Sequence, residues 1–115
     1  MKKLFCLSIL LSISSAALAD YQANVTIGRV FIANDGHVSF GTTPQAPNTC
    51  NYYNVQFTFD STTDGGKSML SLLLSARMAN TKIDVWYTAS TLPGTDWTTG
   101  CNGSKMATAT LVGLP

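Results

Sequence analysis

One segment of the chain, residues 69–79, is typical of a helix, because it contains neither glycine nor proline and repeats apolar side chains at helical spacing. One stripe of this segment consists of Met69, Leu72, Leu73 and Ala76. Leu70 and Leu74 widen the apolar surface beyond that stripe. We therefore expect the helix to contact more than one neighbour, either two parts of one domain or a second subunit.

Capping residues bound this helix on both sides. Asp64 or Ser68 can cap its first turn, because their side-chain oxygens accept hydrogen bonds from exposed backbone amides. Asn80 tolerates the left-handed conformation in which many helices end.

Five segments around the helix have the composition or the alternation of strands. They are residues 21–33, 37–40, a segment that opens at Cys50, 82–90 and 106–114. Gly28 stands where the apolar alternation of the first segment changes phase, which predicts a bulge or a sharp bend. Asn34-Asp35-Gly36 predicts a hairpin turn after that segment, because Asp-Gly tolerates the positive φ of tight turns.

The third and fourth of these segments alternate apolar with polar side chains. In the third, Val55, Phe57 and Phe59 alternate with Gln56 and Thr58, and in the fourth, Ile83, Val85 and Tyr87 alternate with Asp84, Trp86 and Thr88. Both patterns predict a strand with one buried face.

This order of elements predicts a mainly β fold, a five-stranded Greek-key barrel of the OB (oligonucleotide/oligosaccharide-binding) type with one α-helix between strands 3 and 4. The alternative is a β-grasp fold, in which one of the first three strands would be a loop.

The N-terminus has the pattern of an export signal. Lys2 and Lys3 are followed by an apolar stretch and by the small-x-small site Ala17-Leu18-Ala19. We expect residues 1–19 to be a signal peptide and residues 20–115 to be one domain in the bacterial periplasm or the medium. No other apolar run approaches the roughly 18 residues that a membrane span needs.

Composition restricts the partners of the expected mature domain. Without the two lysines of the signal, the domain has five basic and six acidic residues. Such a balance argues against nucleic-acid binding, which needs a basic face to neutralise phosphates.

Two cysteines, Cys50 and Cys101, remain in the expected mature domain, and an oxidising compartment predicts that they pair in a disulfide. Two distant cysteines and one histidine do not make the four ligands of a structural zinc site. We therefore expect no metal and no cofactor.

Catalytic signatures are weak. His37 is the only histidine, and no serine or cysteine arrangement identifies a nucleophile for it. We expect a protein that is not an enzyme, with His37 as an exposed strand residue.

Segment 69–87, a leucine-rich helix that runs through a short polar turn into a strand with paired aromatics, resembles the B subunits of pentameric toxins of the subtilase-cytotoxin and pertussis-like type. The ending Thr110-Leu-Val-Gly-Leu114 resembles the Ala-Leu-Val-Gly-Leu segment of those subunits, and residues 28–32 fall at their first strand. The resemblance implies an exported OB-type barrel that forms a pentameric ring, binds cell-surface glycans and presents a separate catalytic subunit.

The same resemblance implies two site residues. Tyr87 falls on a tyrosine that contributes to sialic-acid binding in the subtilase-type members. The serine of their first strand falls near Ile27, which leaves Thr26 as the nearest hydroxyl.

The aromatic residues also suggest a sugar site on chemical grounds, because sugars bind through C–H contacts with an exposed ring and a few fixed polar groups. Trp86, Tyr87 and Trp97 are the candidates. Tyr87 shares its phase with Ile83 and Val85, so its alternative role is core packing.

The sequence thus predicts a secreted, non-catalytic glycan-binding module. The alternative is a monomeric periplasmic OB-type binding or stress protein that acts alone.

Overall fold

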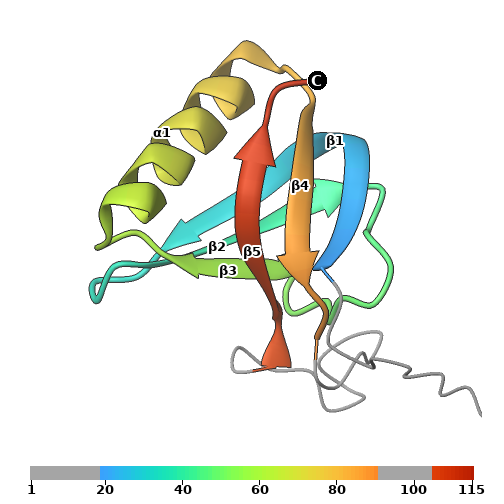
Figure 1. Ribbon diagram of the computed structural model, residues 1–115, viewed down its shortest axis with the longest axis horizontal. Coiled ribbons are helices and arrows are strands. Elements are labelled where there is room, and N and C mark those ends of the chain that lie inside the picture. Colours follow the sequence, from blue (N-terminus) through green and yellow to red (C-terminus); the bar gives the residue numbers. More distant parts are fainter. Residues whose placement is uncertain (1–18, 91–104) are drawn as a thin grey trace, which may run out of the picture.

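Five strands and one helix make up the part of the chain that the computed structural model describes, residues 19–90 and 105–115. In chain order they are β1 (Ala19–Ile32), β2 (His37–Thr43), β3 (Phe57–Asp60), α1 (Asp64–Ala79), β4 (Ile83–Thr88) and β5 (Ala107–Gly113) (Figure 1). The predicted mainly β fold, with its helix between the third and fourth strands, is confirmed. The β-grasp alternative is wrong, because all three strands before the helix form.

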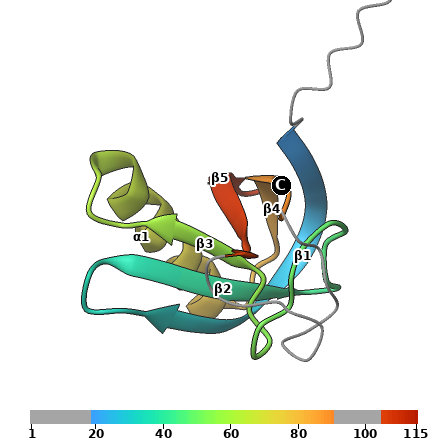
Figure 2. The same ribbon diagram turned by 90° about the horizontal axis from the view of Figure 1, so that it is seen from below.

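The long strand β1 closes the sheet on itself. Its first half pairs with β4, from Ala19 to Val25, and its second half pairs with β2, from Thr26 to Ile32. The strands form a closed barrel in the order β1-β2-β3-β5-β4, in which only β3 and β5 run parallel. Figures 1 and 2 show β1 curving from one side of the barrel to the other.

The predicted irregularity in β1 lies at the expected place. The register between β1 and β2 shifts between Ile27 and Val30, and this step contains Gly28. A bulge adds a residue to one strand and increases its twist, which allows β1 to pair with two different neighbours. A second shift, toward β4, surrounds Asn24, whose φ is 55°.

The turn between β1 and β2 is the predicted hairpin. Gly36 has a φ of 93°, and its amide donates to the carbonyl oxygen of Ala33 at 3.0 Å. The Oδ1 atom of Asp35 accepts from the amide of His37 at 3.0 Å, which lowers the pKa of this carboxyl group. The β2 strand then continues to Thr43, three residues beyond the predicted end.

The third strand begins at Phe57, so the prediction that it opens at Cys50 is wrong. Tyr52 and Val55 form an isolated bridge around Tyr53 and Asn54, whose φ values are 54° and 67°. A strand cannot continue through two residues in the left-handed region.

Helix α1 begins earlier than the predicted residue 69. Its N-cap is Thr63, whose hydroxyl oxygen accepts from the amide of Gly66 at 2.9 Å, so neither Asp64 nor Ser68 takes that position. Asp64 instead lies in the first turn, where a carboxylate is favoured by the helix dipole. The predicted stop is confirmed, because Asn80 has φ 56° and ψ 41°.

The core fills the barrel with side chains from every strand and from α1. It contains Val25, Ile27, Val38, Phe40, Phe57, Phe59, Leu73, Ala76, Ile83, Val85, Tyr87, Ala107 and Ala109. The helix packs against β1 and β5 through Leu73 and Ala76, while Leu70 and Leu72 are only partly covered. Across residues 19–90 and 105–115, no helix has the length and apolar character of a membrane span.

Candidate functional site

A polar hollow, here called the amide pocket, lies where the bulge of β1 and the end of β2 meet the segment that leads to β3. Its volume is about 290 Å³. It is lined by Gly28, Arg29, Gly41, Thr42, Thr43, Gln45, Asn51, Asn54 and Gln56. Four of these residues carry side-chain amides, each of which can both donate and accept hydrogen bonds.

Buried hydrogen bonds hold the floor of the amide pocket in place. Gln56 is buried, and its Oε1 atom accepts from the amide of Thr42 at 2.9 Å. Its Nε2 atom donates to Oδ1 of Asn51, also at 2.9 Å. The polar side chain at position 56 therefore faces inward, although the alternation predicted an exposed one. These two hydrogen bonds fix the orientation of the Gln56 and Asn51 side chains. A binding site for polar ligands requires such fixed groups.

A close backbone approach brings the loop before β3 onto β2. A Cβ atom at Gly41 would overlap the carbonyl oxygen of Asn54 and would lie 3.2 Å from Cα of Val55. Only glycine allows this approach, so Gly41 determines how near Asn54 lies to the strand.

Arg29 gives the amide pocket its charge. The Nη1 atom of this exposed side chain donates to the carbonyl oxygen of Tyr53 at 3.3 Å, and the guanidinium carbon lies 5.5 Å from the ring centre of Phe31. Among the described residues that line the pocket there is no carboxylate, histidine or cysteine. With its amides, hydroxyl groups and one cation, the arrangement can bind a neutral polyol or an anion.

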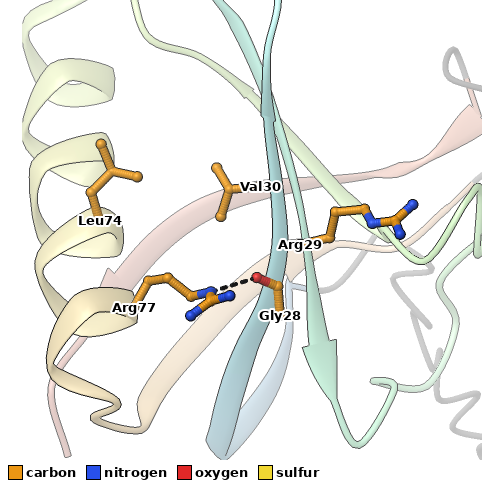
Figure 3. Close-up of a pocket in the computed structure, with 5 residues that line it drawn as sticks. All are labelled: Gly28, Arg29, Val30, Leu74 and Arg77. Carbon is orange, nitrogen blue, oxygen red and sulfur yellow. Dashed lines mark hydrogen bonds between the residues drawn. The ribbon is translucent and has the colours of Figure 1, made fainter.

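A second hollow, here called the helix groove, lies on the other side of the same bulge, between β1 and α1. Its volume is about 540 Å³, and it is lined by Gly28, Arg29, Val30, Leu74 and Arg77. Figure 3 shows Val30 and Leu74 facing across the groove, with Arg29 directed away from it. The Nε atom of Arg77 donates to the carbonyl oxygen of Gly28 at 2.9 Å, which ties the helix to the bulge.

The three predicted site residues that the structure describes, Thr26, Trp86 and Tyr87, are not brought together. Tyr87 is fully buried, and its hydroxyl donates to the carbonyl oxygen of Pro47 at 2.6 Å. Burial raises the pKa of Tyr87 to about 12, with a smaller contribution from the charge of Asp20. Tyr87 therefore has the core position that was its alternative role, with no ring face open to a sugar.

Thr26 and Trp86 lie on different parts of the barrel surface. Thr26 is the register partner of Thr43, so it borders the amide pocket without lining it. Trp86 lies on the outer face of β4, where its ring centre is 4.5 Å from that of Tyr21. Trp97 and Cys101 lie outside the described residues.

Cys50 is fully buried and disulfide-bonded. It packs in a small cluster with Val55 and Met106 at the end of the barrel. The pairing with Cys101 stays a prediction.

His37 begins β2 at the surface. Its Nδ1 atom lies 3.2 Å from Oδ2 of Asp35, and both side chains are more than half exposed. Within residues 19–90 and 105–115, no group of three or more histidine, cysteine or acidic side chains is placed to hold a metal ion.

The residues of the amide pocket were missed by the sequence reasoning, which concentrated on aromatic rings. A signal was present, because segment 42–56 is unusually rich in threonine, asparagine and glutamine.

Comparisons of the chain with protein-family models, with curated proteins and with solved structures found no match.

Proposed function

We propose that this chain is an exported, non-catalytic glycan-binding module that assembles into a ring of identical subunits and presents a separate catalytic subunit, as B subunits of toxins do. In this proposal the amide pocket binds part of a cell-surface oligosaccharide, and the barrel is of the OB type.

The strand connections support the OB type. Strands β1, β2 and β3 are neighbours in chain order, and the chain then passes through α1 before β4 returns to pair with β1. The last strand, β5, lies between β3 and β4 and is parallel to β3. OB folds, which bind oligosaccharides and oligonucleotides, are five-stranded Greek-key barrels, and this strand order supports that assignment.

The observation that carries the binding proposal is the chemistry of the amide pocket. Sugars offer many hydroxyl groups that donate and accept at once, and amide side chains satisfy both functions. The bonds of Gln56 to Thr42 and Asn51 arrange this set before a ligand arrives, which reduces the entropy lost on binding. Arg29 at the rim adds a positive charge that suits an acidic sugar.

The test is retention of purified protein, residues 20–115, on immobilised lactose and sialyllactose. Gln45→Ala and Arg29→Gln remove exposed groups that line the pocket, and neither side chain belongs to the core. We expect both variants to lose retention about tenfold at unchanged melting temperature. Lys82→Gln, an exposed cation far along the chain from the pocket, is the matched control for Arg29→Gln. If wild type and both variants are retained equally, or not at all, on the sugar arrays, the amide pocket is not a glycan site.

The outward side of α1 supports self-association. Leu70, Leu74 and Met78 follow one another at intervals of four residues, and Met78 is 87 % exposed. Val30 extends this apolar band across the helix groove to β1. Soluble domains rarely leave such bands uncovered, because contact with water costs free energy in proportion to the apolar area.

Light scattering on the same protein tests the assembly. We expect a pentamer for the wild-type chain and a smaller species for Met78→Glu. Because Met78 is exposed, this substitution should leave the fold of the single subunit unchanged. Lys67→Gln, an exposed substitution on the same helix, also lowers the net charge by one unit and controls for the change of charge. A wild-type monomer that is retained on no sugar would favour the alternative, a periplasmic OB-type protein that acts alone.

A further inference from the structure

A row of two aromatic side chains and one leucine crosses the outside of the barrel, away from both hollows. Trp86 of β4 is the register partner of Tyr21 on β1 and of Leu111 on β5, so the three side chains lie side by side on the outer face. Tyr21 and Leu111 are 46 % and 49 % exposed, and Trp86 is partly exposed between them. The rings of Tyr21 and Trp86 are inclined at 39°.

Polar residues flank this row on both sides. Thr88 and Thr108 are paired and exposed on one side of Trp86, and Asp84 pairs with Gly113 on the other. Side chains two residues apart on one strand face are separated by roughly 7 Å. A ring that lies on the indole therefore has hydroxyl groups at one end and a carboxylate at the other.

The carboxylate of Asp84 is fixed in position. Its Oδ1 atom accepts from the amide of Asn24 at 2.9 Å, and its Oδ2 atom accepts from the hydroxyl of Tyr21 at 3.2 Å. The charge of Asp84 contributes to a raised pKa of the Tyr21 hydroxyl, after the larger effect of desolvation. Each oxygen of Asp84 retains a lone pair for a further donor.

Gly113 leaves part of the indole uncovered. A Cβ atom at this position would lie 3.9 Å from Cζ3 of Trp86, which is ordinary contact, so alanine fits here without strain and only a longer side chain would extend over the ring.

We propose that this outer face of β1, β4 and β5 is a carbohydrate subsite. A pyranose ring packs its C–H face on Trp86, its hydroxyl groups donate to Asp84 at one end, and Thr88 and Thr108 contact it at the other. The subsite goes beyond the proposed function, because no residue of the amide pocket takes part in it. It favours β-linked sugars with equatorial hydroxyls, since these present a flat C–H face to an aromatic ring.

The composition of the face favours a sugar over a second copy of this chain. An interface between identical subunits has an apolar centre depleted of charge. Here the fixed carboxylate of Asp84 and the hydroxyl of Thr88 each lie two residues from Trp86 along β4, and Thr108 is paired with Thr88. The most exposed apolar side chain of the helix, Met78, belongs to a different surface.

The test uses Trp86 as its own reporter. The chain has two tryptophans, so Trp97→Phe leaves Trp86 as the single emitter. We expect cellotetraose to produce a saturable change in its emission. In that background, Gly113→Leu covers the indole and lowers the affinity about tenfold, whereas Gly113→Ala, the matched control, keeps it. Asp84→Asn, which keeps the size of the side chain, weakens binding without loss of melting temperature.

Three outcomes would overturn the subsite. The first is that cellotetraose causes no saturable change in the emission of Trp86. The second is that the Gly113→Leu and Gly113→Ala variants bind cellotetraose equally well. The third is that the emission depends on the protein concentration and not on the sugar concentration. Adding Gln45→Ala separates this proposal from the amide pocket, because the Trp86 response should survive that substitution even if retention on lactose and sialyllactose is lost.

Discussion

The side-chain oxygen of Gln56 accepts a hydrogen bond from the backbone amide of Thr42 at 2.9 Å, and both residues are buried. This contact joins the residue before β3 to the end of β2, so the floor of the amide pocket and the barrel wall are one structure. A change at Gln56 therefore alters stability as well as the pocket.

Gln56→Leu should lower the free energy of unfolding by about 1–3 kcal/mol, because it leaves the buried amide of Thr42 without an acceptor. Urea unfolding followed by circular dichroism measures the loss. Gln45→Ala changes an exposed amide of the same pocket and should stay within about 0.5 kcal/mol of wild type. Equal midpoints for the two variants would show that the Gln56 bond contributes nothing.

Tyr87→Phe should change how stability depends on pH. The pKa of Tyr87 is raised to about 12 in the folded protein, from 10.0 for an unperturbed tyrosine. A folded pKa above the unfolded one means that the neutral hydroxyl stabilises the fold below pH 10 and that this contribution is lost as the pH rises from 10 to 12. Thermal unfolding across this window should show a shallower decline for Tyr87→Phe than for wild type. Parallel declines would contradict the assignment.

Neighbouring glycines in the first turn of α1 should respond in opposite directions. A Cβ atom at Gly66 would overlap the carbonyl oxygen of Asp60 and lie 2.9 Å from Cα of Ser61, so Gly66→Ala should destabilise the protein by about 1–3 kcal/mol. A Cβ atom at Gly65 meets nothing within 4 Å, and Gly65→Ala should stabilise the protein by about 0.4–1 kcal/mol. Calorimetry measures the melting temperature of each variant. A Gly66→Ala protein that is more stable than wild type would rule out the close contact between position 66 and the carbonyl oxygen of Asp60.

Reduction should destabilise the domain strongly. A bond between Cys50 and Cys101 would close a loop of about 50 residues, which the chain-entropy model values at roughly 4 kcal/mol. Urea midpoints with and without dithiothreitol measure the effect, with the Cys50→Ala/Cys101→Ala double variant as the reference that dithiothreitol should not change. Recovery of a peptide from the native protein in which Cys101 is alkylated would exclude this pairing.

Much of the fold was predictable because it follows from local patterns. The alternation of Ile83, Val85 and Tyr87 predicted a strand whose buried face is the one observed. Gly28 marked the bulge, because the apolar alternation changes phase there. Asn80 marked the helix end, since few residues tolerate its left-handed backbone.

The sequence by itself determined the number and order of the elements, because hydrophobic period, turn chemistry and capping act over a few residues. Only the tertiary structure decided which polar side chains face inward. Gln56 looks like the exposed half of an alternating strand, yet its neighbours along the chain turn back at Tyr53 and Asn54 and bring Thr42 within reach of its oxygen. The amide pocket and the row of Tyr21, Trp86 and Leu111 arise in the same way. Closure of the sheet brings together residues that are far apart in the chain, and local sequence patterns do not predict such contacts.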